Sequence, residues 1–508
     1  MKVFDIPNFV DFLKIFEEVY VSVSFSSQSF KSIFDFFLNF KQIKNLNVKV
    51  SIFIEGLRYL TYKFGSNQII DKVIIDSPTQ TIKDEVFSGC SALTEISIPP
   101  SLLSIGNYSF SGCSKLEKIS IPSCLTSIGK YAFYGCSSLK QVSIQSLEQK
   151  TSNYILGQIS NFFFTNSIDE SAFGGCTSLR QIAIPDSITK ISNFAFYGCS
   201  SLDQISIQNS VKSIGNFVFS GCSSLTQITI PPSITTIDES TFYKCALLTK
   251  INLPNSLTLI KKSAFSQCSS LFEIIIPSSV KLIEELAFSG CSKLEKIVID
   301  PYLTKYELNS FENCTLLHHF EFSSSVEKIH KGFNLIELGE ITKITVPFSV
   351  TLIESSSFKN FQSIKEITIS PSVSEIGEFA FSGCCNLEKV IIDPYQTQLK
   401  SNSFENCSSL LNFEFFSSVT SIQQFNFSEL GKIEKITIPK TVETIGNYSF
   451  YSFSTLKEIE IPESVKNIGK QSFCSCSKLE KVTILSKINS ISPCTFKGCS
   501  SLKEIEIP

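Results

Sequence analysis

A 23-residue pattern recurs 18 times along the chain, and this period restricts the fold more than any other feature. The template is F-x-G-C-S-S-L-x-x-I-x-I-P-x-S-V-x-x-I-G-x-x-A, with positions numbered 1 to 23 from the Phe. A unit this short cannot bury its own Phe, Leu, Ile and Val side chains, so successive copies must stack into a solenoid with continuous interior columns. Position 1 is occupied by Phe87, Phe110, Phe133, Phe173, Phe196, Phe219, Phe242, Phe265, Phe288, Phe311, Phe333, Phe358, Phe381, Phe404, Phe427, Phe450, Phe473 and Phe496.

Two places break the period. The step from Phe133 to Phe173 is 40 residues, which puts 17 extra residues within 145–167, and the steps around Phe333 are 22 and then 25. Insertions in repeat arrays form loops, often on a binding face. The insertion contains Phe162, Phe163 and Phe164 in a row. These side chains are a candidate partner contact, with packing back onto the solenoid as the alternative.

Each copy contains two stretches that are typical of short strands. In L-x-x-I-x-I-P, as in Leu116 to Pro122, the proline ends the strand because it cannot donate to the ladder. Positions 9 and 11 then share the outward face, while position 10 points inward. The stretch V-x-x-I-G returns on the other side of the coil, and Gly at position 20 is predicted to supply a positive φ.

Residues 1–66 lie outside the repeat. Segments 6–20 and 29–40 have helical apolar spacing, whereas 46–54 alternates like a strand. We therefore expect a small α+β N-terminal cap over the first open edge of a solenoid that spans residues 67–508. A separate ligand-binding role for this region is the alternative.

The repeats resemble the BspA-like class of leucine-rich repeats, most closely in FSGCSKLEKISIP (110–122) and FSGCSSLTQITIP (219–231). The resemblance implies a β-rich, right-handed leucine-rich-repeat solenoid with a parallel sheet on one face. It further implies a surface antigen or adhesin that binds protein or matrix partners, and it brings no catalytic residues. An intracellular protein-interaction scaffold of the same fold is the alternative.

The 18 cysteines follow the repeat more than any metal-binding spacing. Apolar Phe361, Leu430 and Phe453 replace Cys at position 4 elsewhere, which indicates a buried site that needs volume. The four cysteines off this column, Cys124, Cys385, Cys474 and Cys494, form no C-x₂-C pair, so no metal is expected. The column itself comprises Cys90, Cys113, Cys136, Cys176, Cys199, Cys222, Cys245, Cys268, Cys291, Cys314, Cys384, Cys407, Cys476 and Cys499.

The outward strand positions give the candidate binding residues. Position 9 carries Gln in four successive copies, whose amides we expect to hydrogen-bond up the column. Toward the C-terminus, positions 8 and 9 alternate in charge between neighbouring copies, which favours the parallel register. In the middle of the array, apolar residues rimmed by polar ones predict a partner contact, with ordinary β-propensity as the alternative. This group is Phe272, Ile275, Val298, His318, His319 and Glu321.

No reaction chemistry emerges from the sequence. Only three histidines occur, no H-E-x-x-H, phosphate-binding glycine loop or G-x-S-x-G is present, and no paired carboxylates stand out. We therefore expect a non-enzymatic protein without cofactor, metal or small-molecule substrate. With 44 basic against 47 acidic residues, nucleic acid is not an expected partner.

The sequence gives conflicting indications of location. Acidic residues stand where a signal peptide would be apolar, no run of 18 apolar residues predicts a membrane span, and abundant thiols favour a reducing cytoplasm. The family resemblance implies the cell surface instead, and both locations stay open at this point.

Overall fold

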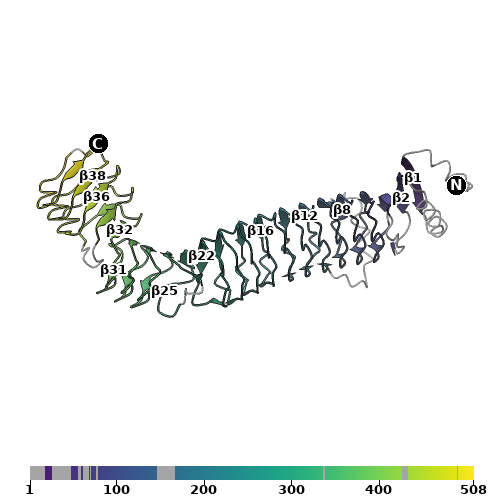
Figure 1. The fold of residues 1–508 in the computed structure, drawn as a ribbon, viewed down its shortest axis with the longest axis horizontal. Coiled ribbons are helices and arrows are strands. Elements are labelled where there is room, and N and C mark those ends of the chain that lie inside the picture. The colour runs from purple at the N-terminus through teal and green to yellow at the C-terminus, as the bar shows by residue number, and fades with distance from the viewer. Residues whose placement is uncertain are drawn as a thin grey trace, which may run out of the picture. The chain divides into compact units, whose positions relative to one another are not determined.

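The fold is a parallel β-solenoid, as the period predicts (Figure 1). A computed structural model describes residues 18–25, 47–54, 59–60, 68, 70–75, 78–145, 166–333, 335, 338–425, 433–488 and 490–507, and these contain no α-helix. The chain forms two compact units. The first comprises Met1–Phe272, Ser279–Leu294 and Tyr306–Thr315; the second comprises Glu273–Ser278, Glu295–Lys305 and Leu316–Pro508.

The main strands carry template positions 9 to 12, and each pairs in parallel with its neighbours one repeat away. Gln181 pairs with Gln204, and Ile182 with Ile205. In the first unit these strands are β1 Glu18–Phe25, β2 Asn47–Ile54, β4 Ile70–Ile75, β6 Glu95–Ser97, β8 Lys118–Pro122, β10 Gln141–Gln145, β12 Gln181–Ala183, β14 Gln204–Ser206, β16 Gln227–Thr229 and β18 Lys250–Asn252. In the second unit they form one 11-stranded sheet of β20 Glu273–Ile275, β22 Lys296–Ile299, β24 His319–Phe322, β26 Lys343–Val346, β28 Glu366–Ile369, β30 Lys389–Ile392, β32 Asn412–Phe415, β34 Lys435–Thr437, β36 Glu458–Ile461, β38 Lys481–Ile484 and β39 Glu504–Glu506.

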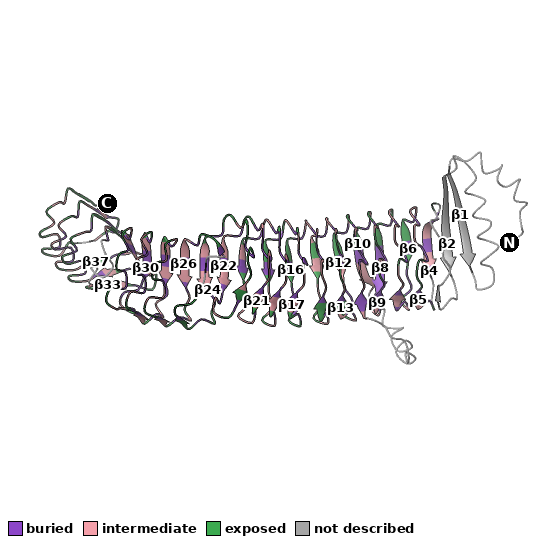
Figure 2. Ribbon diagram, turned by 60° about the horizontal axis from the view of Figure 1, so that its bottom comes forward, coloured by how far each residue is buried: buried purple, intermediate pink, exposed green. Residues whose placement is uncertain are grey.

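A second row of two-residue strands returns along the other side of the coil, as predicted for V-x-x-I-G (Figure 2). Seven of them, β3 to β15 in odd numbers, form one parallel sheet. These strands are β3 Tyr59–Leu60, β5 Thr81–Ile82, β7 Ser104–Ile105, β9 Ser127–Ile128, β11 Ser167–Ile168, β13 Lys190–Ile191, β15 Ser213–Ile214, β17 Thr236–Ile237, β19 Leu259–Ile260, β21 Leu282–Ile283, β23 Lys305–Tyr306, β25 Lys328–Ile329, β27 Leu352–Ile353, β29 Glu375–Ile376, β31 Gln398–Leu399, β33 Ser421–Ile422, β35 Thr444–Ile445 and β37 Asn467–Ile468.

The phenylalanines at position 1 form the predicted interior column. From Phe87 to Phe311 in the first unit, adjacent rings stack with centroids 5.1–5.6 Å apart and planes within 13° of each other. Phe133 and Phe173 stack at 5.1 Å although 40 residues separate them in sequence. The insertion therefore leaves the ring column uninterrupted.

The position-4 cysteines are buried, as predicted, and their thiols also hydrogen-bond. Each thiol donates to the carbonyl of the Phe one turn earlier, as Cys222 Sγ does to Phe196 O at 3.3 Å. Burial raises the pKa of the Cys199 thiol to about 12, so it is uncharged at neutral pH. All 18 cysteines are free thiols. The apolar replacement Phe453 is buried and Phe361 is half-buried, while Leu430 lies outside the described residues.

The predicted role of Gly at position 20 was wrong. Gly106, Gly129 and Gly215 do not have positive φ; instead, a Cβ there would lie 2.6–2.8 Å from a backbone nitrogen of the preceding turn. Glycine is thus needed because adjacent turns approach closely. Positive φ occurs at position 3, as at Gly221 (78°), and at position 22, where ordinary residues such as Phe217 (56°) adopt it.

The N-terminal prediction is only partly tested. The predicted strand 46–54 is confirmed as β2, which pairs in parallel with β1 and β4 and so extends the main sheet. The helix predicted for 6–20 was wrong at its end, because β1 begins at Glu18 and its residues pair with β2. The rest of that segment, and 29–40, lie outside the described residues. The cap formed by residues 1–66 stays a prediction.

The second unit contains two D-P-Y turns that use a buried acid and a tyrosine clamp. Asp393 Oδ1 accepts from the Tyr395 N–H at 3.0 Å, and its Oδ2 accepts from the Ser418 hydroxyl at 2.9 Å. The Tyr395 hydroxyl donates to the Gln423 carbonyl and accepts from the Gln423 N–H, both at 2.8 Å. Tyr302 makes the same pair of contacts with His330. Each tyrosine thus ties its own turn to the next one.

We expect Tyr395→Phe to lower the free energy of unfolding by about 1 kcal/mol, because both backbone groups of Gln423 lose their partner. Chemical denaturation followed by circular dichroism measures this. Tyr197→Phe is the control, since its exposed hydroxyl makes no hydrogen bond within the described chain. Equal losses in the two variants would contradict the clamp.

Candidate recognition surface on the outward strand face

The outward face of the main strands changes character along the chain. On β10, β12, β14 and β16 of the first unit, position 9 is an exposed glutamine in every strand: Gln141, Gln181, Gln204 and Gln227. Charge is present at this position before them, in the Lys72–Glu95 ion pair at 2.9 Å, and returns after them at Lys250. Four successive strands thus carry no charge at positions 9 and 11.

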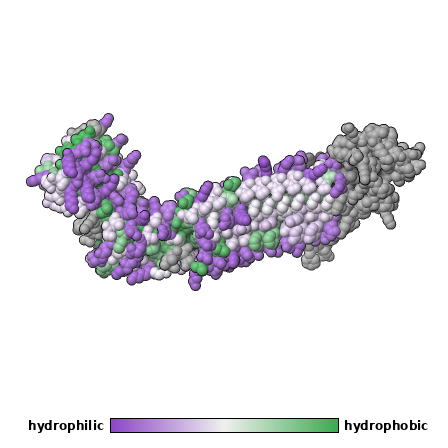
Figure 3. Space-filling view, viewed as in Figure 1, coloured by the Kyte–Doolittle hydropathy of each residue, from purple (hydrophilic) through white to green (hydrophobic). Residues whose placement is uncertain are grey.

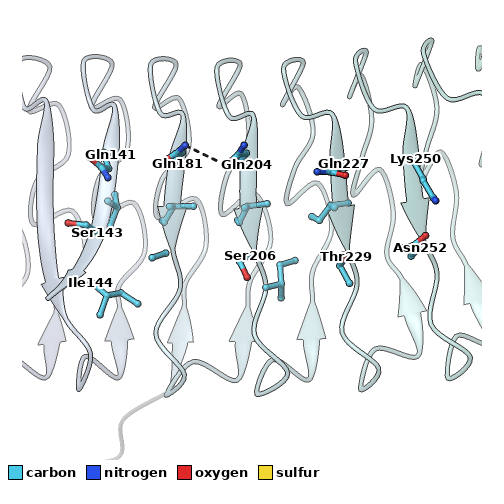
Figure 4. A pocket seen from close by; sticks show the side chains of 16 residues that line it. Gln141, Ser143, Ile144, Gln181, Gln204, Ser206, Gln227, Thr229, Lys250 and Asn252 are labelled. Carbon is cyan, nitrogen blue, oxygen red and sulfur yellow. Dashed lines mark hydrogen bonds between the residues drawn. The ribbon is translucent and has the colours of Figure 1, made fainter. Parts of the chain in front are cut away.

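Below the glutamines the surface is hollowed. Position 11 carries the small side chains of Ser143, Ala183, Ser206 and Thr229, and a hollow of about 810 Å³ extends from β10 to β18 over them (Figure 4). The predicted amide ladder is present at one step: Gln181 Nε2 donates to Gln204 Oε1 at 3.5 Å, a long hydrogen bond. Among the described residues, Gln141 and Gln227 have no side-chain partner.

The outward face of the second unit is covered by cross-strand ion pairs, as the charge alternation predicts. Lys435 lies 3.0 Å from Glu458, and Lys457 lies 2.6 Å from Glu434. Pairs of exposed charges stabilise a protein by only about 0–1 kcal/mol each, so their main effect here is to set the register and neutralise the surface. In Figure 3 strongly hydrophilic residues cover much of this unit, whereas paler residues of intermediate hydropathy cover a broad area of the first.

The candidates predicted in the middle of the array lie largely on the second unit. Ile275, 58% exposed, pairs in register with Val298, and Val298 pairs with Glu321 on the next strand. Lys296 forms ion pairs with Glu321 at 2.7 Å and with Glu273 at 3.0 Å beside this apolar pair. An exposed apolar patch with a charged rim results.

The remaining candidates are less closely associated with that patch. Phe272 is 53% exposed and belongs to the first unit. His318 is exposed just before β24, with its Nδ1 hydrogen-bonded to the Leu316 carbonyl at 2.7 Å. Half-buried His319 lies in the position-9 column between two lysines. Phe162, Phe163 and Phe164 lie outside the described residues.

His319 is held neutral by its position. Burial lowers its pKa to about 4, and Lys296 and Lys343 on the flanking strands lower it further than Glu321 raises it. Its Nε2 hydrogen-bonds the Thr345 hydroxyl at 2.8 Å. The imidazole is therefore suited to neutral hydrogen bonding rather than to binding anions at pH 7.

We expect the His319 ring to titrate near pH 4 in an NMR titration of the folded chain. The unfolded chain binds this proton at a usual pKa of about 6.5, so stability falls as the pH drops from about 6.5 toward 4. His319→Gln should weaken that acid sensitivity while changing stability little at pH 7. A ring titrating at the usual value would contradict the predicted environment.

The described part of the chain contains no group of three His, Cys, Asp or Glu side chains that could hold a metal ion. It also contains no helix of the length and apolarity that a membrane span requires. Sequence reasoning missed the hollow of the first unit. The signal was present in the short side chains at position 11 beside the Gln column, which becomes meaningful once both positions are known to face outward.

Comparisons with known proteins agree with the fold. The chain is similar to a leucine-rich repeat protein of Bacteroides ovatus at 24% identity, covering 84% of this chain and 86% of that one with a TM-score of 0.25. It is also similar to a leucine rich cell surface protein of Faecalibacterium prausnitzii at 22% identity, covering 75% and 90% with a TM-score of 0.27. A Treponema pallidum leucine rich repeat protein matches at 24% identity, covering 42% and 82% with a TM-score of 0.29.

No curated protein matches the chain at a significant level. The family model of the BspA type leucine rich repeat region, in contrast, matches residues 60–161, 156–258, 235–338, 336–451 and 420–508. These matches span nearly all of the solenoid. The chain therefore belongs to the BspA type leucine-rich repeat family.

Proposed function

We propose that this protein is a non-enzymatic recognition solenoid that binds a protein or matrix partner at the cell surface, in the manner of an adhesin or surface antigen. Leucine-rich repeats form protein-interaction solenoids, and the similar Faecalibacterium protein is described as a cell surface protein. The observation that carries the proposal is the apolar pair Ile275 and Val298, exposed on a sheet that is otherwise covered by ion pairs.

The chemistry of this patch fits a protein partner. An apolar centre with a polar rim is the usual anatomy of a protein interface. Here Glu273, Lys296 and Glu321 supply the rim. The neutral His319 and exposed His318 add hydrogen-bonding groups on the adjacent strand. Phe272, on the first unit, and Phe162, Phe163 and Phe164 are proposed as further contacts.

Binding of the purified chain to a panel of extracellular-matrix proteins tests the site. We expect Ile275→Asp to weaken binding at least about tenfold, because a charge replaces the apolar centre of the contact. Thr437→Asp is the matched control, since Thr437 is exposed at the same template position on β34. Equal binding by both variants would remove the patch from the proposal, and a wild-type chain that binds no matrix protein would refute the adhesin.

An intracellular scaffold is the second candidate, favoured by the 18 free thiols. Antibody labelling of intact and permeabilised source cells separates the two. Labelling of intact cells supports a surface protein, and labelling only after permeabilisation supports the scaffold.

A further inference from the structure

We propose that the hollow on β10, β12, β14 and β16 is a second binding site, and that it takes an uncharged polysaccharide chain lying across the strands. This proposal concerns the first unit alone and is independent of the protein contact proposed for Ile275 and Val298.

The absence of charge is the first argument. The outward residues at positions 9 and 11 of these four strands are amides, hydroxyls and one alanine, whereas the corresponding residues of the second unit are paired Lys and Glu side chains. Lys140, Arg180 and Asp203 flank the hollow at position 8, and their opposite signs leave little net field. A surface of this kind neither attracts a polyanion nor compensates a buried charge.

Unused hydrogen-bonding capacity is the second argument. Each glutamine amide has one acceptor oxygen and two donor hydrogens. The only side-chain hydrogen bond among the four glutamines in the described chain is the 3.5 Å contact between Gln181 and Gln204. Ser206 and Thr229 likewise have no side-chain partner there. Ligand hydroxyls can therefore replace water at these groups without breaking protein contacts.

The geometry favours a polymer. Parallel strands lie about 4.8 Å apart, so a ligand running along the solenoid meets an equivalent amide at every step. The small side chains at position 11, above all Ala183, give it room beside the glutamines (Figure 4). A glycan chain offers hydroxyls at a similar short interval, and weak contacts repeated along it add up.

A protein partner fits this hollow less well. Protein interfaces depend on aromatic or arginine anchors in desolvated pockets, and the outward positions 9 and 11 of these four strands carry neither. A hydroxyl-rich, uncharged ligand matches what these positions offer.

Affinity gel electrophoresis of the full chain with soluble β-glucan, mannan or galactan in the gel tests the proposal, with polygalacturonate as the charged comparison. We expect at least one neutral polysaccharide to retard the wild-type chain, and added salt to leave the retardation unchanged because no ion pairs are involved. The double variant Gln181→Ala/Gln204→Ala should bind about tenfold more weakly. Ala183→Phe, which fills the hollow, should bind at least as poorly.

The double variant Lys435→Ala/Glu458→Ala is the matched control, because it removes the same template position from two neighbouring strands of the second unit. It should be retarded like the wild-type chain, and circular dichroism should show all variants folded. Three results would overturn the proposal: no retardation by any neutral polysaccharide, retardation by polygalacturonate alone, or equal effects of the glutamine and control variants. Loss of matrix-protein binding in Ile275→Asp with glycan binding intact would separate the two sites.

Discussion

Phe219→Ala should lower the free energy of unfolding by about 4 kcal/mol, the range expected when a buried Phe is truncated. The Phe219 ring is fully buried and stacks on Phe196 at 5.6 Å and on Phe242 at 5.5 Å. The cavity would therefore remove the contacts of two neighbouring turns. Collapse around it is restricted, because backbone hydrogen bonds hold the adjacent turns at a fixed spacing.

Urea denaturation followed by circular dichroism measures this loss. Leu308→Ala serves as the control, since Leu308 is apolar but 65% exposed in the same unit, and should change stability by less than about 0.5 kcal/mol. A loss of stability in Phe219→Ala no greater than in Leu308→Ala would contradict the ring column. Because stability in solenoids is a sum over neighbouring repeats, the first unit should show the larger shift.

The repeat made the interior predictable. A period of 23 residues places Phe110, Cys113, Leu116 and Ile119 at fixed steps, and burial in stacked columns follows because one turn alone has no core. The alternation of Lys435 and Glu458 likewise fixed the parallel register, which the ion pairs confirm.

Details that depend on the distance between turns could not be predicted. Gly106 looked like a positive-φ residue, but its role is to let the backbone near Asp84 approach, which a single copy of the template does not reveal. The Cys222 hydrogen bond to Phe196 links atoms 26 residues apart, three more than the period, so a column-by-column comparison misses it.

The binding surface was predicted least well, for a physical reason. Solvent-exposed positions are free to vary, so Ile275 could be assigned to the outward face while its exposure of 58% required the positions of its neighbours. The hollow near Ala183 depends on short side chains in four strands at once. Such a property belongs to the stacked assembly and is weak in any one repeat.

Cys222→Asp should destabilise the fold by about 3–5 kcal/mol at pH 7, because it places an unpaired carboxylate in a site without water. Cys222 is fully buried, and burial raises the pKa of its thiol well above the usual value. Burial would raise the pKa of the new carboxyl in the same way. Its folded-state pKa would then exceed its unfolded value, so the loss of stability should shrink as the pH falls toward the unfolded pKa of about 3.9.

Two controls separate burial from the hydrogen bond. Cys222→Ser keeps a donor for the Phe196 carbonyl and should cost only about 1 kcal/mol, whereas Cys494→Asp lies in an exposed turn and should leave the urea midpoint unchanged. Equal effects of Cys222→Asp and Cys494→Asp would contradict the buried column. If Cys222→Ser were as harmful as Cys222→Asp, thiol volume rather than charge would decide the site, and Cys222→Ala would then match it.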